Sequence, residues 1–557
     1  MNVQVLQGIN LENTITTIKI TTDKTPRTEL VDLVKDLHPV FMEEYSIEGN
    51  TISIQSKLPH FWKETAVALN NFSSNEWSFD LAKSYILGTV IKKQILSMST
   101  IPILHAAHEL GYETTQYFIE QGFTPENAAS KFNRYYGIGI GQESEVTASI
   151  ASSRDSHLAM MTQSDKWLTN IMLDRLKLPI AQWELINSEG HLKELHEKYR
   201  KPYVIKPVGL TGGNGVTTNI NTFDQAQAAY ETATKAINSR ERAEFQKKIM
   251  IQQTVQGEDY RLLVIAGRLE IVTKRIPAFV TGDGAQTIEK LIAEINKDPR
   301  RDLANPTHIL KPIIIDDQLT TYLKEQGLDI NYVPKKDEKI YVRKVASMSQ
   351  GGITEDFTDR VSNQIRYVVE SLASSLHAYA LGVDVICKDI SKPLTQENGS
   401  IIECNTMPES YLNAFPVIGD QYPQIGKIVV KGLVGNKPFT KKIVYIGKDI
   451  KKLHAFLKTQ TDASEKTGIL SNGSIYINEE EINANLETWK ALEAMKLNAS
   501  LSTIAIHYES IDEVRESGLG FDRIDAILID NKYESEDWTS KLEGYKNLGL
   551  INTIKTV

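Results

Sequence analysis

Two segments far apart in the chain combine apolar strand residues with a small set of polar ones. The first is Val204-Ile-Lys-Pro-Val-Gly-Leu-Thr-Gly-Gly-Asn-Gly-Val216, an apolar strand that runs through Lys206 into a glycine-rich loop. The second is Gly382-Val-Asp384, followed by Ile401-Ile-Glu-Cys-Asn405. A lysine with a glycine loop suits phosphate groups, and clustered side-chain oxygens suit a hard cation. We therefore expect a fold that brings the two segments to one site.

The region around these segments alternates predicted strands and helices, which favours an α/β architecture. Val383–Cys387 and Ser400–Cys404 are expected to pair with each other, because both are short, apolar and separated by a loop with Pro393 and Gly399. The other predicted elements are strands at 201–205, 249–255, 260–266 and 269–275 and a long amphipathic helix at 361–381.

A chain of 557 residues has room for several domains. A break at Gly435-Asn-Lys-Pro438 divides it into a predicted N-terminal α/β domain (1–160), a central domain (161–437) and a C-terminal domain (438–557). The net charge of −9 gives no general basic field for nucleic acid. Two cysteines, no visible secretory signal and no long apolar run predict a cytoplasmic protein with no membrane partner.

The nucleotide signals are weak when each is taken alone. The glycine loop after Lys206 is not a Walker A motif, because no Gly-Lys-Ser/Thr follows, and it is also compatible with an ordinary turn. The segment Ile249–Val255 leads to Gly257-Glu-Asp259, which can set an adenine edge against strand backbone and a carboxylate on ribose. A buried strand ending in a turn is the alternative.

The metal signal is more specific. Glu403 and Asn405 lie two residues apart on one predicted strand, so their side chains share a face, and Asp384 lies on the neighbouring strand. Cys404 then points the other way, into packing. Two carboxylates and an amide facing one pocket are costly without a cation. The three residues therefore predict a Mg²⁺ site, with a solvated polar face as the alternative.

Several longer segments carry a family resemblance. Residues 161–437 resemble an ATP-grasp carboxylate–amine ligase and, more narrowly, the ATP-grasp region of cyanophycin synthetases. The resemblance rests on motifs in the family's order over some 300 residues: Tyr135-Tyr-Gly-Ile-Gly through Asp165-Lys166, Lys274-Arg-Ile-Pro-Ala-Phe-Val-Thr-Gly-Asp-Gly284, Asn296-Lys-Asp-Pro-Arg-Arg301 and Tyr341-Val-Arg-Lys-Val-Ala-Ser-Met-Ser-Gln-Gly-Gly352.

The resemblance implies roles for individual residues. Asp259 is expected to hold the ribose, and Arg261 and Arg343 to grip a carboxylate or an acyl phosphate, although a surface arginine is the alternative for Arg343. Arg275 is a weaker candidate. The remaining implied contacts are Lys166, Lys206, Gly212 and Gly213 on ATP phosphates, Gln252 and Val255 beside the adenine, and Asp384, Glu403 and Asn405 on Mg²⁺.

Residues 438–557 resemble the start of the Mur-ligase-like half of the same family, but its phosphate-binding chemistry is missing. Where that family has a P-loop, this chain reads Gly447-Lys-Asp-Ile-Lys-Lys-Leu453, without the second glycine or the hydroxyls. The histidine expected after Asn531 is also missing, and the chain ends at Val557, earlier than such a half should. We expect a degenerate domain that serves folding or dimer contacts.

One intact site beside one degenerate domain predicts a ligase that forms amide bonds through an acyl phosphate. By resemblance, the leading hypothesis is polymerisation of β-aspartyl-arginine dipeptides into cyanophycin or a related polypeptide. The alternatives are a ligase that adds one amino acid or peptide, as glutathione synthetases do, and a non-enzymatic scaffold with a vestigial ATP-grasp fold. The resemblance also implies a homodimer or homotetramer that acts on an amino acid, a dipeptide or a peptide polymer.

Overall fold

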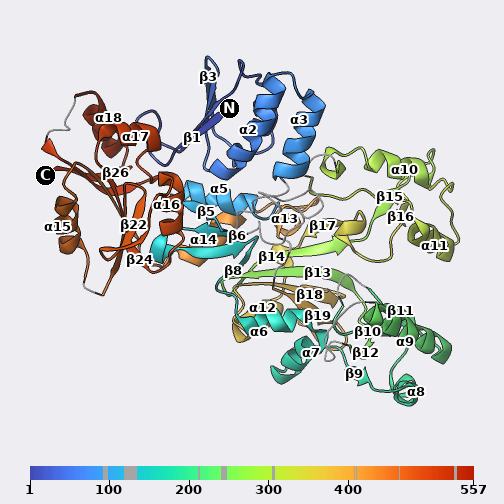
Figure 1. Cartoon of the computed structure of the whole chain (residues 1–557). Coiled ribbons are helices and arrows are strands. Elements are labelled where there is room, and N and C mark those ends of the chain that lie inside the picture. Colours follow the sequence, from blue (N-terminus) through green and yellow to red (C-terminus); the bar gives the residue numbers. More distant parts are fainter. Residues whose placement is uncertain are drawn as a thin grey trace. The chain divides into compact units, whose positions relative to one another are not determined.

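The computed structural model describes residues 1–91, 98–117, 135–210, 214–239, 247–303, 308–406, 408, 410–462, 464–531 and 536–557. The chain forms two compact units (Figure 1). One unit joins Met1–Ser149 to Gln424–Val557, and the other is the continuous stretch Ile150–Pro423. Each unit contains sheets covered by helices, so the α/β multidomain prediction is confirmed.

The second unit contains a four-stranded antiparallel sheet in the order β11-β10-β12-β9. Its strands are β9 (Trp183–Ile186), β10 (Tyr203–Pro207), β11 (Thr217–Ile220) and β12 (Ile249–Gln253). Helices α8 (Glu189–Lys198) and α9 (Phe223–Asn238) contribute Leu192, Leu195, Ala226 and Ala233 to a core shared with Ile205 and Ile251. The predicted strands at 201–205 and 249–255 are both present, with ends shifted by about two residues.

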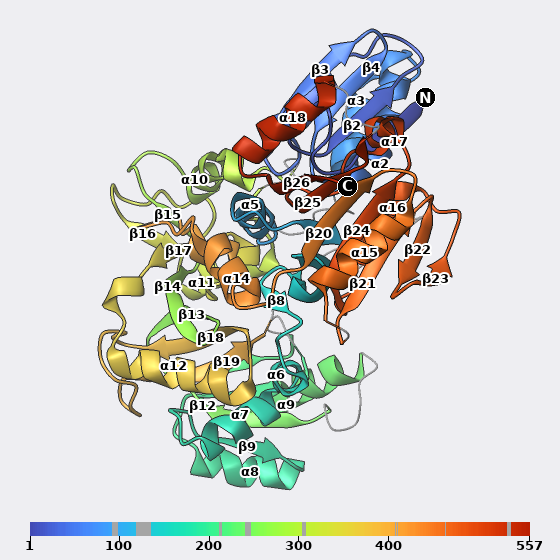
Figure 2. The same ribbon diagram turned by 90° about the vertical axis from the view of Figure 1, so that its left-hand side faces the viewer.

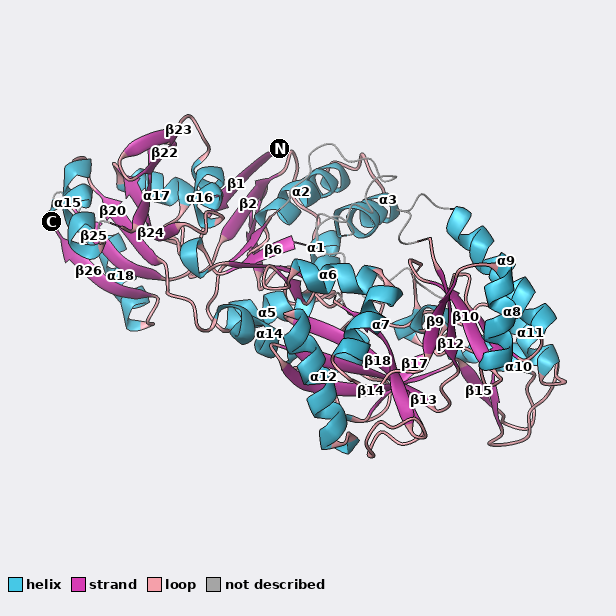
Figure 3. Cartoon of the chain, turned by 90° about the horizontal axis from the view of Figure 1, so that it is seen from below, coloured by secondary structure: helices cyan, strands magenta, loops and turns pink. Residues whose placement is uncertain are grey.

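A five-stranded antiparallel sheet follows in the order β17-β14-β13-β18-β19. The strands are β13 (Glu258–Ile265), β14 (Arg268–Ile276), β17 (Ile353–Asp356), β18 (Ala380–Cys387) and β19 (Gly399–Asn405). Helix α12 (Asn363–Leu376) lies along this sheet (Figure 3) and buries Ile365, Val369 and Leu372 against it. Helices α6 (His157–Ser164) and α7 (Lys166–Arg175) add Ala159 and Leu173 to the same core.

The helix predicted at 361–381 is wrong at its C-terminal end. Helix α12 ends at Leu376, because His377 adopts a left-handed conformation with φ 50°. The residues after it, Ala380 and Leu381, already belong to β18. Their buried, apolar character fits a helix and a core strand equally well, so periodicity alone does not find the boundary.

A small α/β lobe is inserted between β14 and β17. Strands β15 (Phe279–Thr281) and β16 (Lys339–Tyr341) form a two-stranded sheet. Helices α10 (Ile288–Ile295) and α11 (Asp317–Glu325) pack on it around Val280, Ile292 and Leu319.

The first unit contains the N-terminal sheet β1-β2-β4-β3 and a seven-stranded sheet, β23-β22-β21-β24-β20-β25-β26 (Figure 2). The five strands β21, β24, β20, β25 and β26 are parallel neighbours. The elements of this unit are β1 (Asn2–Leu6), β2 (Thr17–Thr21), α1 (Glu29–Lys35), β3 (Tyr45–Glu48), β4 (Thr51–Gln55), α2 (Pro59–Ser73), α3 (Phe79–Tyr85), a π-helix (Ile86–Ile91), α5 (Ile101–Glu109), β5 (Thr114–Gln116), β6 (Tyr135–Ile138), β7 (Glu145–Ala148), α14 (Ile425–Val434), β20 (Lys441–Ile446), α15 (Ile450–Gln460), β21 (Lys466–Ser471), β22 (Ser474–Ile477), β23 (Glu480–Asn483), α16 (Thr488–Lys496), β24 (Leu501–Tyr508), α17 (Ile511–Ser517), β25 (Ile524–Ile529), α18 (Glu536–Asn547) and β26 (Ile551–Thr556).

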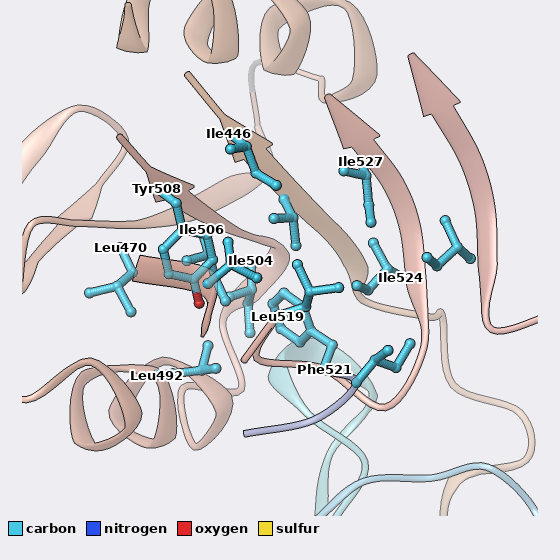
Figure 4. Close-up of a cluster of buried hydrophobic side chains, with 14 of the residues drawn as sticks. Ile446, Leu470, Leu492, Ile504, Ile506, Tyr508, Leu519, Phe521, Ile524 and Ile527 are labelled. Atoms are coloured by element: carbon cyan, nitrogen blue, oxygen red, sulfur yellow. The ribbon is translucent and has the colours of Figure 1, made fainter. Parts of the chain in front are cut away.

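Both faces of the seven-stranded sheet are buried, as in other parallel sheets. Helix α15 packs Leu453 and Leu457 on one face. The other face carries a larger core around Ile506, Leu519 and Phe521 (Figure 4). That core also takes in Ile9 and Ile140 from the first 149 residues. The start and the end of the chain therefore share one core, and the predicted division at 160 and 437 stays a prediction.

A glycine allows the closest approach in this shared core. Gly8 has φ +67° and lies so near Phe521 that an added Cβ would be 2.3 Å from its backbone nitrogen. The backbone of Ile9 donates to the carbonyl of Phe521 at 2.8 Å, and Leu519 donates to the carbonyl of Ile9 at 2.7 Å. A side chain at position 8 has no space, so glycine is required here.

Candidate functional site

The three predicted metal ligands lie on two paired strands of the five-stranded sheet. Asp384 on β18 is the register partner of Glu403 on β19, and Asn405 stands opposite Gly382. Asp384 is 8% exposed. Cys404, between the two β19 residues, is fully buried in the core, and burial raises the pKa of its thiol to about 12. The strand alternation therefore sets the polar side chains on one face and the thiol on the other, as the sequence predicts.

Both predicted phosphate-binding lysines interact electrostatically with the carboxylate of Glu403. Lys206 stands near the end of β10 and is 5% exposed. Lys166 begins α7, whose N-cap Asp165 accepts hydrogen bonds from the backbone of Trp167 and Leu168. The ammonium of Lys166 lies 3.5 Å from Glu403 Oε1 and donates to the carbonyl of Leu210 at 2.6 Å. The strand before the glycine loop and the strand with the acidic pair thus reach one cluster.

The electrostatics of Lys206 agree with this placement. The pKa of its ammonium is lowered to about 8, mainly by burial and also by the positive charge of Lys166. The carboxylate of Glu403 acts in the opposite direction. Two ammonium groups and one carboxylate leave excess positive charge in a site with little access to water. An anion such as a phosphate group relieves that excess.

Two arginines hold Asp384. Arg261 on β13 is its register partner, and its Nε donates to Asp384 Oδ1 while its Nη2 lies 3.3 Å from Oδ2. Arg275 on β14 donates through Nη2 to Asp384 Oδ2 at 3.0 Å and to Asp259 Oδ1 at 2.6 Å. Burial lowers the pKa of Arg275, but the charges of Asp384 and Asp259 outweigh it and raise the pKa overall.

For the pKa of Asp259, burial outweighs the effect of the neighbouring charges. Burial raises the pKa of its carboxyl above the ordinary value, and the charge of Arg275 offsets only part of that effect. The predicted ribose-binding residue is therefore joined to the predicted metal ligand Asp384 through one guanidinium. Arg275 is only a weak candidate from the sequence, because cross-strand neighbours such as Asp259 and Arg275 become visible only when the register is known.

The residues fit a hard divalent cation in kind, because Asp384, Glu403 and Asn405 all offer side-chain oxygens. In the structure both oxygens of Asp384 are engaged by guanidinium groups. No group of three or more His, Cys, Asp or Glu side chains with metal-binding geometry is found in the part of the chain that the structure describes.

The predicted adenine contacts lie on the neighbouring sheet. Gln252 on β12 is 4% exposed, and its Nε2 has no hydrogen-bond partner among the described residues. Val255 follows this strand and is half-buried. A buried amide donor without a partner is the kind of group that a ligand satisfies. Gly212 and Gly213 lie outside the described residues.

Arg343 belongs to the inserted lobe. It is 4% exposed, which rules out a surface arginine. Its guanidinium donates to Asp316 Oδ1 at 2.8 Å and to Asp316 Oδ2 at 2.9 Å, and it also donates to the carbonyl of Ile314 at 2.7 Å. Asp316 is the N-cap of α11, so the pair ties the end of β16 to that helix. Its Nε has no partner within the described ranges.

The loop that replaces a P-loop is closed by side chains of the protein, one of them from β24. The carbonyl of Gly447 accepts a hydrogen bond from His507 Nε2 at 2.6 Å, and a Cβ on Gly447 would lie 2.4 Å from the Tyr445 hydroxyl. Asp449 caps α15 and accepts from the backbone of Lys451 at 3.1 Å. A carboxylate therefore occupies the helix N-terminus, where a phosphate would otherwise be favoured.

Comparisons with known proteins agree with the sequence motifs. Residues 164–274 match the family model of the phosphoribosylglycinamide synthetase ATP-grasp (A) domain. The chain is 30% identical over 400 residues to the cyanophycin synthetase of Synechocystis sp., a match that covers 71% of this chain and 45% of the relative. It is 29% identical over 296 residues to the glutathione biosynthesis bifunctional protein GshAB of Clostridium perfringens, covering 53% and 37%.

Among solved structures, a bifunctional glutathione synthetase from Pasteurella multocida matches with a TM-score of 0.46 and 23% identity, covering 66% of this chain and 49% of that one. The chain spans less than half the length of the curated cyanophycin synthetases that it matches. The family model and the similarity to the Synechocystis protein confirm the resemblance to cyanophycin synthetases and the ATP-grasp region.

No helix in the described ranges is long and apolar enough to cross a membrane.

Proposed function

We propose, from an ATP-grasp region similar to that of cyanophycin synthetases, that this chain is an ATP-dependent carboxylate–amine ligase. The observation that carries the proposal is the meeting of Lys166, Lys206 and Glu403, with Asp384 across the strand pair from Glu403. Cationic groups for phosphates and oxygen ligands for a metal are what phosphoryl transfer needs from a protein, since catalysis of this step is mainly positioning and charge stabilisation.

The reaction runs in two steps. A carboxylate oxygen of the first substrate attacks the γ-phosphorus of ATP, the bond to the β–γ bridging oxygen breaks, and ADP leaves. The resulting acyl phosphate is attacked at its carbonyl carbon by an amine, which loses a proton as the amide forms and inorganic phosphate departs. Lys166 and Lys206 stabilise the phosphate charge in the first step.

Asp384, Glu403 and Asn405 would hold Mg²⁺, which supplies positive charge at the phosphate oxygens when it is bound. For Asp384 to act as a ligand, Arg261 or Arg275 has to give up a hydrogen bond to it. The guanidinium released in this way is then available to the substrate carboxylate or the acyl phosphate, the role proposed for Arg261. Gln252 and Val255 would contact adenine, Asp259 the ribose, and Gly212 and Gly213 the phosphates.

Arg343 is proposed as a second contact for the substrate carboxylate. Its buried position beside Asp316 supports a restrained guanidinium rather than a mobile one. The inserted lobe would have to bring Arg343 to the substrate carboxylate. The Nε of Arg343 has no hydrogen-bond partner among the described residues, so it is the donor available for this contact.

The proposed substrates are β-aspartyl-arginine dipeptides, joined into cyanophycin or a related polypeptide. Two features support this choice. The chain is similar to cyanophycin synthetases over most of its length, and its C-terminal loop offers a carboxylate where phosphate would bind. A preformed dipeptide fits one ATP site, because joining each unit then needs only one carboxylate activation.

Single addition of an amino acid or peptide is the second candidate, favoured by the similarity to the glutathione biosynthesis proteins over about half of the chain. A scaffold with no ATP chemistry is the third. The buried Lys206 opposes it, because burial and the charge of Lys166 both disfavour its ammonium, and a phosphate would offset them. Assembly as a homodimer or homotetramer stays a prediction.

The test is incubation of the full chain with ATP, Mg²⁺ and β-aspartyl-arginine, with phosphate release and product mass as readouts. Polymer supports the leading proposal. A single adduct with another amine acceptor supports the second candidate, and no ATP binding at all supports a scaffold. Asp384→Asn should abolish turnover. Asp174→Asn changes an exposed aspartate on α7 that pairs with Lys177, and it should leave turnover unchanged.

A further inference from the structure

The first unit contains a narrow polar cavity remote in sequence from the ATP-grasp residues. Its walls come from the start of the chain, from the beginning of α2, from β5 and from two C-terminal segments around α16 and Asp522. The volume open to the centre of a water-sized sphere is about 50 Å³. One water needs roughly 10–15 Å³ on this measure, so the cavity admits a molecule larger than water but not a nucleotide.

Charged side chains of both signs line this cavity. Lys496 pairs with Glu113 at 2.6 Å, and both side chains are only 6% exposed. Lys57 pairs with Asp522 at 2.7 Å, and His60 lies 2.9 Å from Glu493. Ion pairs buried to this degree gain little stability over apolar packing, because desolvation offsets their attraction. Their concentration around one cavity points to recognition rather than to stability.

Lys57 and Asp522 form a charged pair, an ammonium beside a carboxylate. Burial would raise the pKa of Asp522, but the ammonium of Lys57 lowers it overall. Burial also lowers the pKa of the neighbouring His108 to about 3, so this imidazole is neutral at pH 7. The cavity therefore presents fixed ammonium and carboxylate groups, not an uncharged polar lining.

Two amide groups on the wall have unused hydrogen-bonding capacity. Gln7 is 8% exposed, and its Oε1 is buried without a hydrogen-bond partner among the described residues. Gln116 Nε2 is likewise buried without a partner in the part of the chain that the structure describes. One unsatisfied acceptor and one unsatisfied donor in the same cavity suit a ligand that both donates and accepts.

We propose that this cavity is a binding site for a free α-amino acid, separate from the ATP-grasp site. The ligand's ammonium would lie among Glu113, Glu493 and Asp522, its carboxylate beside Lys57 and Lys496, and its remaining polar atoms on Gln7 and Gln116. Size favours a single amino acid over a dipeptide, and paired charges of opposite sign favour a zwitterion over a simple anion or cation. The site joins early and late segments of the chain, so occupancy stabilises the first unit.

The experiment is calorimetric titration of the full chain, without ATP, with glycine, L-aspartate, L-asparagine and L-arginine. At least one should bind and raise the melting temperature. The N-acetyl and carboxamide derivatives of the best ligand lose one charge each and should bind at least about tenfold more weakly, because each loses a charge-assisted contact. Equal binding of either derivative would overturn the zwitterion assignment, and binding of none of the four amino acids would overturn the site.

A near-isosteric variant separates this site from the rest of the molecule. Gln7→Leu with Gln116→Leu removes one unsatisfied polar atom at each position, so the folded chain should keep or raise its melting temperature while affinity falls by about tenfold or more. Gln460→Leu, an exposed change at the end of α15, is the matched control and should leave affinity unchanged. Lys206→Met should also leave it unchanged. Affinity that survives the double variant, or disappears in Lys206→Met, would assign the binding to another site.

Discussion

Two places in the molecule put a strand end and a glycine next to a lysine, and they have opposite electrostatics. Near the end of β10, Lys206 is buried beside Lys166, and the glycine loop follows. After β20, Gly447 is followed by Lys448 and then by Asp449, whose carboxylate caps α15. At the first place, two ammonium groups share the carboxylate of Glu403 and leave positive charge in excess. At the second place, the Asp449 carboxylate already accepts from the backbone at the start of α15. A strand–glycine–lysine pattern therefore indicates a phosphate site only when the fold leaves its cationic groups in excess.

The largest expected effect concerns the amide at the metal set. Asn405→Ala should reduce kcat on the order of 100-fold or more, because it removes one of the three proposed oxygen ligands of the Mg²⁺ that neutralises phosphate charge. Phosphate release at saturating ATP measures it. Asn552→Ala, which removes an exposed amide bonded to Asp525 on the C-terminal sheet, is the control and should leave kcat unchanged. Retained activity in Asn405→Ala would remove Asn405 from the site.

The lysines test the comparison directly. Lys206→Met should weaken ATP binding by about 30-fold, because a charge-assisted contact to phosphate is lost. The same change should raise the stability of the ATP-free chain, since a buried ammonium whose pKa falls from 10.5 to about 8 carries a folding cost of about 3 kcal/mol near pH 7.

The exposed Lys448 after Gly447 supplies the counterpart. Lys448→Met should change neither ATP affinity nor stability appreciably. Titration with ATP and a denaturant melt report both quantities. A loss of ATP affinity in Lys448→Met would show that the C-terminal loop still binds nucleotide, and the contrast between the two loops would fail.

The pH dependence sharpens the same contrast. The pKa of Lys206 is depressed in the folded chain, so between about pH 8 and 10.5 the unfolded chain binds more protons. The contribution of Lys206 to stability therefore rises with pH in this window. ATP prefers the charged ammonium, so its affinity should fall about tenfold from pH 7 to pH 9. Calorimetry at both values checks this, and Lys206→Met should lose the dependence.

The smallest expected effect concerns Arg275. Arg275→Met removes a cation that competes for Asp384, so the affinity for Mn²⁺ without nucleotide should rise by about fivefold, from roughly 1 kcal/mol of lost competition. Electron paramagnetic resonance of free Mn²⁺ measures it without any turnover. Arg360→Met, on the neighbouring turn, should have no effect. Weaker Mn²⁺ binding in Arg275→Met would mean that Arg275 orients Asp384 for the metal instead of competing with it.

Much of the candidate site follows from sequence because it depends on local alternation. Glu403, Cys404 and Asn405 take their faces from the two-residue period of a strand, and Asp384 meets them because one loop joins β18 to β19. The end of α12 and the role of Arg275 do not follow in this way. The first depends on the backbone of His377, and the second on a register between β13 and β14 that composition does not encode.

The charge state of the site was also beyond sequence reasoning. Lys166 and Lys206 are 40 positions apart along the chain, and their mutual repulsion exists only after α7 and β10 pack together. The closure of the Gly447 loop by His507 is similar, because residues 60 positions apart make that hydrogen bond. The missing glycine and hydroxyls predict the loss of phosphate binding. The structure adds that Asp449 caps the helix after this loop and that His507 bonds to its Gly447 carbonyl.

The core that Ile9 and Ile140 share with Phe521 has a consequence for biosynthesis. A ribosome releases the N-terminal sheet first, but the partners of its apolar residues emerge only after the whole second unit has been translated. Until then these side chains stay open to chaperones or to other nascent chains. We expect nascent chains stalled before β24 to be captured by chaperones through their earliest residues, although the second unit is by then fully synthesised.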